Sequence, residues 1–166
     1  MAEQLREHAQ AAIQALGSRT LACAESLTAG LICSTLAEIP GVSANLRGGI
    51  VCYASDVKAE LLGVDRELLR RYGPVHAQVA AQMARGVARV LHADAAIATT
   101  GVAGPGPADG KAAGTVYVAA CLGPHLLVRE LALSGDRQAV REGAAQAGFD
   151  LVSTLGEQIR PPMCYA

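Results

Sequence analysis

The sequence predicts an α/β fold, a three-layer α/β/α sandwich with a mixed, mainly parallel sheet. Short apolar segments alternate with longer segments of helical periodicity, as in parallel strands joined by helices. The composition is 51% hydrophobic but only 3% aromatic, so Ala, Val, Leu and Ile must build the core, which suits a sheet covered by Ala-rich helices. A hairpin signal late in the chain adds antiparallel strands to this sheet.

The first half of the chain predicts a helix followed by two strand–helix units. Gly17 ends the first helical pattern, and Pro40 with Gly41 ends the second. Gly48 and Gly49 lie within the second strand, where they predict a bulge or a close approach of backbone. We expect, in order, a helix over residues 3–16, a strand over 20–25, a helix over 28–39, a strand over 46–53 and short helices over 55–62 and 65–72.

The second half predicts a long helix, a buried strand, a hairpin and a last helix. Residues 101–110 contain four glycines and two prolines and therefore form a loop. Gly123 and Pro124 separate two β-rich segments, which is typical of a hairpin. We expect a helix over residues 76–92, strands over 93–100, 114–122 and 125–133, and a helix over 136–158 that Pro161 and Pro162 close. Since 166 residues suffice for one well-buried core and are few for two, we expect a single domain over residues 1–166.

Composition and charge exclude several classes of protein. The formal net charge is −1 at pH 7 and Lys and Arg form no stripe, whereas a protein that binds duplex nucleic acid needs positive charge to neutralise phosphates. No apolar segment is long enough to span a membrane, and residues 1–10 lack the apolar region of a signal peptide. We therefore expect a cytoplasmic protein with neither nucleic acid nor a membrane as its partner.

The cysteines and histidines predict no metal site and no cofactor. The five cysteines form no C-x-x-C pair, and four of them lie in apolar segments, as buried thiols of a reducing compartment do. Those four are Cys23, Cys33, Cys52 and Cys121. The four histidines are scattered, without the spacing of a helical metal site.

Three polar segments each begin where a predicted strand ends. They are Ala24-Glu25-Ser26-Leu27-Thr28-Ala29-Gly30, Tyr53-Ala54-Ser55-Asp56-Val57-Lys58 and Thr100-Gly101-Val102-Ala103-Gly104-Pro105. In open α/β sheets, ligands bind beyond the carboxyl ends of the strands. We therefore expect the three segments to meet in one site.

The first segment places a serine hydroxyl between a strand and a helix. Ser26 can act as a nucleophile there, and the backbone N–H groups at the helix start can bind a phosphate, a carboxylate or an oxyanion. Alternatively, Ser26 or Thr28 is the N-cap of the helix, which is the more ordinary role of a hydroxyl in this position.

The second segment offers a base for that serine. Lys58 follows Tyr53 by about one and a half helical turns, so both side chains can reach one cleft. A lysine that is partly buried near a serine can have its pKa lowered and act as a general base, while a tyrosine relays a proton or orients the pair. The alternative for Lys58 is a solvated position on a helix face.

The third segment opens a loop that matches neither common nucleotide-binding pattern. Five residues separate Gly104 from Gly110, where a P-loop has four, and Ala112 stands where the P-loop has a magnesium-binding Ser or Thr. The backbone N–H groups of the loop can still cradle a phosphate. The alternative is a plain connection between two strands.

Two arginines lie at the start of the last helix. Arg137 and Arg141 are four residues apart and therefore share one side of the helix. The helix dipole disfavours cations there, so the pair indicates an anionic ligand such as phosphate, with an ion pair to Asp136, Glu142 or a neighbouring chain as the alternative. His76 stands at another helix start, where we expect a surface or capping residue rather than a catalytic one.

Together these segments resemble the C-terminal domain family of the competence/damage-inducible protein CinA, whose stand-alone members include nicotinamide mononucleotide amidohydrolases. The resemblance is collinear over residues 21–141. It is carried by Ala24-Glu25-Ser26 with Thr28 and Gly30, Arg47-Gly48 with Tyr53 and Lys58, Gly101-Val102-Ala103-Gly104-Pro105, Gly114-Thr115-Val116, and Ser134-Gly135-Asp136-Arg137 with Val140-Arg141.

The resemblance implies a three-layer fold, commonly dimeric or of higher order, that hydrolyses the carboxamide of nicotinamide mononucleotide to a carboxylate and ammonia without a metal. Ser26 is then the nucleophile, Lys58 its base and Tyr53 the supporting hydroxyl. At the substrate the resemblance places Thr28, Gly30, Arg47, Gly48, Thr100, Gly101, Val102, Ala103 and Gly104, with Arg137 and Arg141 near the phosphate.

The chain also departs from the family pattern. The departures are Leu27, Ala29, Ser55, His76 and the stretch Gly106-Pro107-Ala108-Asp109. Two alternatives therefore stay open. The chain is a catalytically impaired relative that binds a nucleotide ligand as a dimer, or an amidase for a different nucleotide or pyridine amide.

Overall fold

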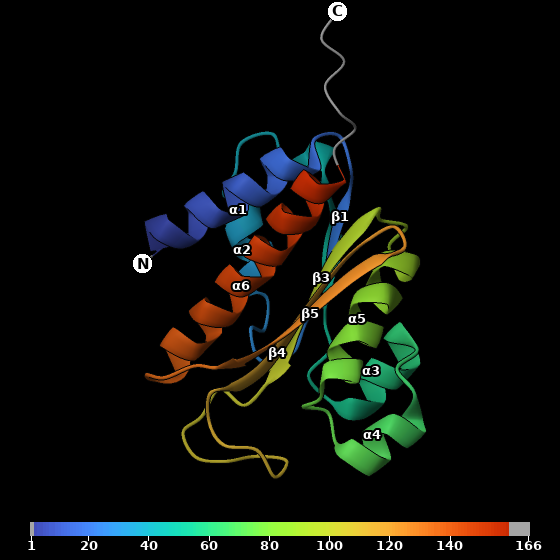
Figure 1. Ribbon diagram of the computed structural model, residues 1–166, viewed down its shortest axis with the longest axis vertical. Coiled ribbons are helices and arrows are strands. Elements are labelled where there is room, and N and C mark those ends of the chain that lie inside the picture. The colour runs from blue at the N-terminus through green and yellow to red at the C-terminus, as the bar shows by residue number, and fades with distance from the viewer. Residues whose placement is uncertain (1, 160–166) are drawn as a thin grey trace, which may run out of the picture.

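The computed structural model describes residues 2–159, in which five strands form one sheet between two layers of helices (Figure 1). In chain order the elements are α1 (Ala2–Leu16), β1 (Leu21–Glu25), α2 (Leu31–Ala37), the 3-10 helix η1 (Val42–Ala44), β2 (Leu46–Val51), α3 (Ser55–Leu62), α4 (Arg66–Tyr72), α5 (Ala77–Val90), β3 (Ala95–Gly101), β4 (Thr115–Leu122), β5 (His125–Ala132) and α6 (Arg137–Gln158).

The sheet is mixed, as predicted, and has the strand order β2-β1-β3-β4-β5. Strand β1 pairs in parallel with both β2 and β3, while β4 runs antiparallel to β3 and β5. Four strands therefore point the same way and β4 alone is reversed. Because β2, β1 and β3 share a direction, their carboxyl ends meet at one edge of the sheet.

Each face of the sheet is covered by its own group of helices. Figure 1 shows α1, α2 and α6 on one side and α3, α4 and α5 on the other. Side chains alternate along β1, so that Leu21 and Cys23 pack toward the first group while Ala22 and Ala24 pack toward the second. Phe149, the single phenylalanine, is fully buried in the first core, where such burial contributes about 1.5–3 kcal/mol.

The glycines of β2 produce both of the features expected of them. The pairing of β1 with β2 shifts register between Leu21 and Ala22, which leaves Arg47 as the extra residue of a bulge. A side chain at Gly49 would collide with Sγ of Cys33 on α2, so glycine permits the close approach of α2 to the sheet. Cys23, Cys52 and Cys121 are buried and Cys33 is partly buried, and all four are free thiols. Cys164 lies outside the described residues.

Several elements are shorter than the sequence predicts, and two of these differences lie beside the polar segments. The helix expected from residue 28 begins at Leu31, because residues 26–30 form a turn, and the strand expected to reach Tyr53 ends at Val51.

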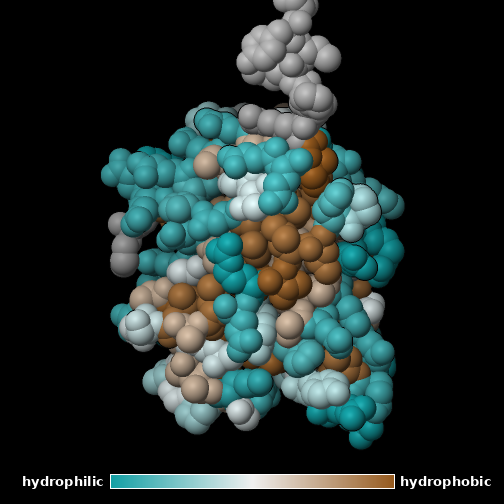
Figure 2. All heavy atoms as spheres, in the orientation of Figure 1, coloured by the Kyte–Doolittle hydropathy of each residue, from teal (hydrophilic) through white to brown (hydrophobic). Residues whose placement is uncertain are grey.

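Strand β5 is an edge strand, and Figure 2 shows apolar side chains gathered on the face that carries it. None of the helices within residues 2–159 combines the length and the apolar character needed to cross a membrane. Pro161 and Pro162 lie outside the described residues.

Candidate active site

The hydroxyl of Ser26 and the amine of Lys58 meet at the carboxyl edge of the sheet. Ser26 directly follows β1, and its backbone N–H donates to the carbonyl oxygen of Thr99 on β3 at 3.1 Å. Nζ of Lys58 lies 3.0 Å from Oγ of Ser26. Lys58 is 0% exposed and Ser26 7% exposed, so the contact is shielded from bulk water. The solvated helix face considered for Lys58 is therefore wrong.

The amine of Lys58 is held by the turn that precedes its own helix. Besides Ser26, Nζ donates to the backbone carbonyls of Cys52 and Tyr53, each at 2.8 Å. These bonds form because α3 starts at Ser55, soon after β2 ends, so that Lys58 in the first turn of α3 lies close to the backbone of residues 52 and 53. Burial lowers the pKa of Lys58 from 10.5, and the charges of Cys52 and Asp109 oppose that shift.

The pair opens into a cavity of about 310 Å³, a volume within the range of small-molecule sites. The lining residues come from the ends of β1, β2 and β3, from α3, from the α4–α5 connection, from the β3–β4 loop and from the start of α6. They are Ser26, Tyr53, Lys58, Pro74, Val75, Thr100, Gly101, Val102, Ala103, Gly104, Pro105, Gly106, Pro107, Ala108, Asp109 and Arg137. The three polar segments thus share one cavity, together with Arg137.

Arg137 links two walls of this cavity. Its Nη1 donates to the carbonyl oxygen of Gly104 at 2.6 Å, and its Nη2 donates to Oη of Tyr53 at 3.1 Å. Tyr53 is 59% exposed, so its ring stands at the cavity mouth rather than in the core. Asp136 caps α6 by accepting from the N–H of Ala139 at 2.8 Å. Among the described residues, no ion pair joins Arg137 to Asp136 or Glu142.

Three of the predicted binding residues lie behind the cavity and do not line it. The hydroxyl of Thr28 is 2.8 Å from that of Thr99, and Nη2 of Arg141 donates to the carbonyl oxygen of Thr28 at 2.7 Å. Gly30 is the N-cap residue of α2. Thr100 does line the cavity, and its hydroxyl donates to the carbonyl oxygen of Pro74 at 2.8 Å.

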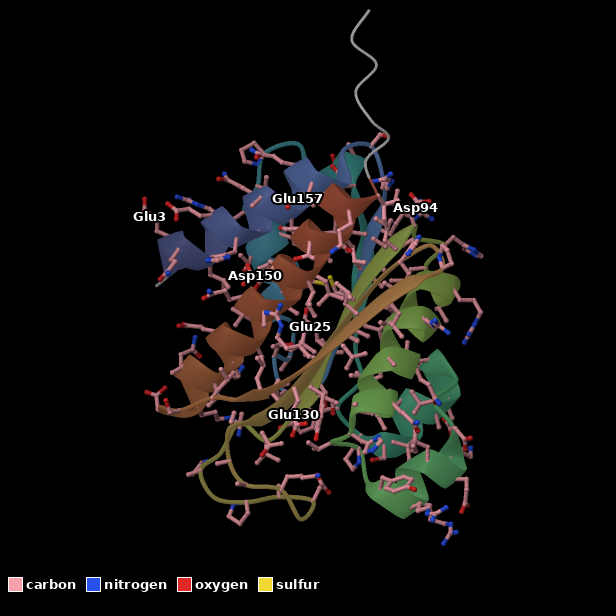
Figure 3. The ribbon with its side chains drawn as sticks, viewed as in Figure 1. Glu3, Glu25, Asp94, Glu130, Asp150 and Glu157 are labelled. Carbon is pink, nitrogen blue, oxygen red and sulfur yellow. The ribbon has the colours of Figure 1, made fainter. Side chains whose placement is uncertain are left out.

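Arg47 and Gly48 lie at the other edge of the sheet, contrary to the expectation that they contact the ligand. Because β2 runs parallel to β1, Gly48 pairs with Ala22 near the start of β1, four residues or about 13 Å from Ser26. Nε of Arg47 donates to the carbonyl oxygen of Leu91 at 3.1 Å. Figure 3 labels Asp94, which precedes β3 and marks this edge.

Glu25 is the residue that sequence reasoning missed. Its side chain is 1% exposed, and Figure 3 labels it in the interior of the molecule. The carboxylate accepts from the N–H groups of Gly30 at 2.9 Å, Ile32 at 3.1 Å and Cys33 at 2.9 Å. These N–H groups at the start of α2 were expected to bind a ligand, and Glu25 occupies them instead. The signal was present, since a glutamate ends an otherwise apolar strand.

The capping roles are also settled by these contacts. Gly30 precedes α2 without a side-chain cap, so neither Ser26 nor Thr28 is the N-cap considered above. His76 caps α5, its Nδ1 accepting from the N–H of Gln78 at 3.2 Å, as the sequence predicts. Within residues 2–159, no three His, Cys, Asp or Glu side chains are grouped to hold a metal ion.

Comparison with known proteins matches this chain to the CinA C-terminal domain over residues 2–155. A CinA-like protein of Frankia casuarinae is 47% identical over 138 residues, which cover 83% of this chain and 32% of that protein. The chain thus spans about a third of the length of the curated relatives it matches.

Solved structures of similar proteins have the same fold. A CinA superfamily protein from Enterobacter cloacae superposes with a TM-score of 0.87 at 31% identity, covering 92% of both chains. The competence/damage inducible protein CihA from Agrobacterium tumefaciens superposes with a TM-score of 0.86 at 34% identity, covering 91% of this chain and 94% of that one. The chain therefore belongs to the CinA C-terminal domain family.

Proposed function

We propose that the cavity is the active site of a metal-independent amidohydrolase that converts nicotinamide mononucleotide and water into nicotinate mononucleotide and ammonia. The observation that carries this proposal is the 3.0 Å contact between Oγ of Ser26 and the buried Nζ of Lys58 at the wall of the cavity. A hydroxyl paired with a shielded amine is a common arrangement for attack on an amide carbonyl.

The contacts of Lys58 suit the role of a general base. A neutral amine has two hydrogens and one lone pair. The carbonyl oxygens of Cys52 and Tyr53 accept the two hydrogens, which directs the lone pair toward the hydroxyl of Ser26. Burial lowers the pKa of Lys58 and so increases the fraction of neutral amine near neutral pH.

The reaction proceeds in two halves on this geometry. Lys58 takes the proton of Ser26 as Oγ attacks the carboxamide carbon, and it returns that proton to the nitrogen as the carbon–nitrogen bond breaks and ammonia leaves. Lys58 then takes a proton from a water molecule that attacks the resulting ester on Ser26. The carbon–oxygen bond to Ser26 breaks and its oxygen recovers the proton from Lys58. The carboxylic acid product gives its remaining proton to ammonia or water and is released as the carboxylate.

The remaining lining residues fit the rest of the substrate. The N–H groups at the start of α2 are bound by Glu25, and the N–H of Val102 donates to the carbonyl oxygen of Thr115 at 2.9 Å. The backbone N–H groups of Ala103 and Gly104 in the β3–β4 loop are therefore the proposed donors to the oxyanion. A guanidinium has five donors, and Arg137 uses only some of them on Gly104 and Tyr53. Its charge is therefore available to a phosphate.

The direct test is release of ammonia from nicotinamide mononucleotide by the purified chain without added metal. Ser26→Ala removes the nucleophile and should lower kcat/KM by about 10⁴-fold or more. Ser34→Ala is a matched control, because Ser34 is an exposed hydroxyl on α2 that bonds only to the carbonyl oxygen of Leu31. Ser26→Ala protein that folds and keeps turnover within tenfold of the unmodified chain refutes the mechanism.

The same assay separates the alternatives drawn from the sequence. Binding of the mononucleotide without release of ammonia would indicate a nucleotide-binding protein that has lost the chemistry. Release of ammonia from other pyridine or nucleotide amides, but not from the mononucleotide, would indicate an amidase of different specificity.

A further inference from the structure

The tip of the β3–β4 loop is a rigid turn that carries a carboxylate. The N–H of Ala108 donates to the carbonyl oxygen of Lys111 at 3.0 Å, and the reverse bond is 2.9 Å long. Between them, Asp109 and Gly110 have φ angles of 51° and 71°. Two consecutive positive φ angles define a type I′ turn, for which Asp-Gly is a favoured pair. The position of Asp109 is therefore fixed by its backbone.

This turn brings Asp109 to the cavity that holds Ser26 and Lys58. The loop folds over the α4–α5 connection, so that a Cβ at Gly73 would lie 3.9 Å from Cβ of Asp109. Asp109 lines the cavity beside that connection, and its charge acts on Lys58. Among residues 2–159 the carboxylate has no ion-pair partner, so its charge is not neutralised within the described chain.

The cavity consequently presents both signs of charge. Arg137 contributes a permanent cation from the start of α6, and Asp109 contributes an anion from the loop tip. Lys58 is neutral in the reactive state proposed above. Such a wall complements a substrate that has an anionic group at one end and a cationic group at the other, and nicotinamide mononucleotide has a phosphate and an N-alkylated pyridinium ring.

We propose that Asp109 is a specificity residue that favours amide substrates whose amide-bearing ring is positively charged. This inference rests on the proposed amidohydrolase function and adds a preference within it. Asp109 is exposed at the cavity mouth, where water screens a charge pair. The preference is accordingly expected to be about three- to tenfold, between a surface ion pair and a partly desolvated one.

Asp109→Asn isolates this charge. Asn-Gly is as well suited to a type I′ turn as Asp-Gly, so the loop keeps its shape. The matched control is Asp56→Asn, which removes an exposed carboxylate on α3 that does not line the cavity. The two probes are nicotinamide mononucleotide and its 1,4-dihydro form, which has the same phosphate and carboxamide but an uncharged ring.

Binding is measured by calorimetry in the Ser26→Ala background, where the substrate is not consumed. Asp109→Asn should weaken binding of the charged-ring probe by about three- to tenfold and leave the dihydro probe within about twofold, and raised salt should reduce the preference of the parent protein. Asp56→Asn should change neither Kd by more than about twofold. The ratio of the two ligands cancels any effect of the substitution on the phosphate and carboxamide contacts, because both ligands carry these groups.

The outcomes separate this inference from the proposed function. An unchanged ratio in Asp109→Asn, or failure of both probes to bind, overturns the role of Asp109. A shifted ratio supports it even if the unmodified chain releases no ammonia, in which case the proposed chemistry alone is wrong. Turnover of the mononucleotide with an unchanged ratio leaves the chemistry standing and removes the specificity residue.

Discussion

Substitution of Glu25 by glutamine should destabilise the protein far more than a one-atom change at the surface would. The carboxylate accepts three backbone N–H bonds, two on Oε2 and one on Oε1. In Glu25→Gln one oxygen becomes an NH₂ group, which faces an N–H donor and leaves it unpaired, and the other two bonds lose their charged acceptor. We estimate a loss of about 3–5 kcal/mol, since an orphaned buried donor costs about 1–3 kcal/mol and a charged hydrogen bond exceeds a neutral one by about 1 kcal/mol.

Urea denaturation followed by circular dichroism measures this loss. With a slope of about 1–3 kcal/mol per molar urea, the midpoint should fall by about 1–5 M. Ser34→Ala in the same helix should stay within about 0.5 kcal/mol of the parent, because Ser34 is exposed. The turn that carries Ser26 lies between Glu25 and α2, so kcat should fall as well. A loss of stability below about 1 kcal/mol refutes the conclusion that Glu25 holds this turn.

Three further expectations follow from the site and the helix layers. Because protonated Lys58 cannot accept a proton, kcat/KM should rise with pH and level off below pH 10.5. Asp109→Asn should move this rise to lower pH, because it removes a charge that raises the pKa of Lys58. A pH profile that follows a lysine with an unshifted pKa contradicts the assignment of Lys58 as the base. Arg137→Lys keeps the positive charge but loses the forked donor that bonds to Gly104 and Tyr53, so kcat/KM should fall by about tenfold. The Tm, read by differential scanning fluorimetry, should change by less than about 2 °C. A large loss of Tm would show instead that Arg137 has a structural role. Gly86→Ala places a Cβ 2.9 Å from Cβ of Leu62 on α3. This overpacking should lower the free energy of unfolding, measured by urea titration, by about 1–3 kcal/mol. An unchanged urea midpoint would mean that α3 moves aside freely.

The architecture was predictable because local signals and long-range packing agree. Apolar length and periodicity placed all five strands and the six α-helices of the described residues but not the short helix η1, and Gly123 with Pro124 placed the hairpin between β4 and β5. The start of α2 was placed too early because it is set by a side chain on the neighbouring strand. The helix propensity of residues 28–30 carries no information about Glu25, the side chain that binds the first N–H groups of α2.

The candidate site was predictable where it depends on strand ends. Ser26, Lys58, Tyr53 and the β3–β4 loop converge because parallel strands deliver their carboxyl ends to one edge. Arg47 was expected at the ligand but lies away from the cavity. The resemblance matched this residue to the family without indicating which end of β2 lies at the cavity. Asp109 was not singled out as a site residue, because only the fold of the loop tip over Gly73 brings it to the cavity.

The bond from the N–H of Ser26 to Thr99 has a consequence for the newly made protein. Strand β1 lies in the sheet between β2, which the ribosome makes next, and β3, which it makes much later. Tyr53 and Arg137, which bond across the cavity mouth, are 84 residues apart, or about 4–17 s of synthesis at 5–20 residues per second. A partly synthesised chain therefore contains Ser26 and Lys58 before Thr99 and Arg137 have been made, and the cavity walls are complete only once translation has reached α6.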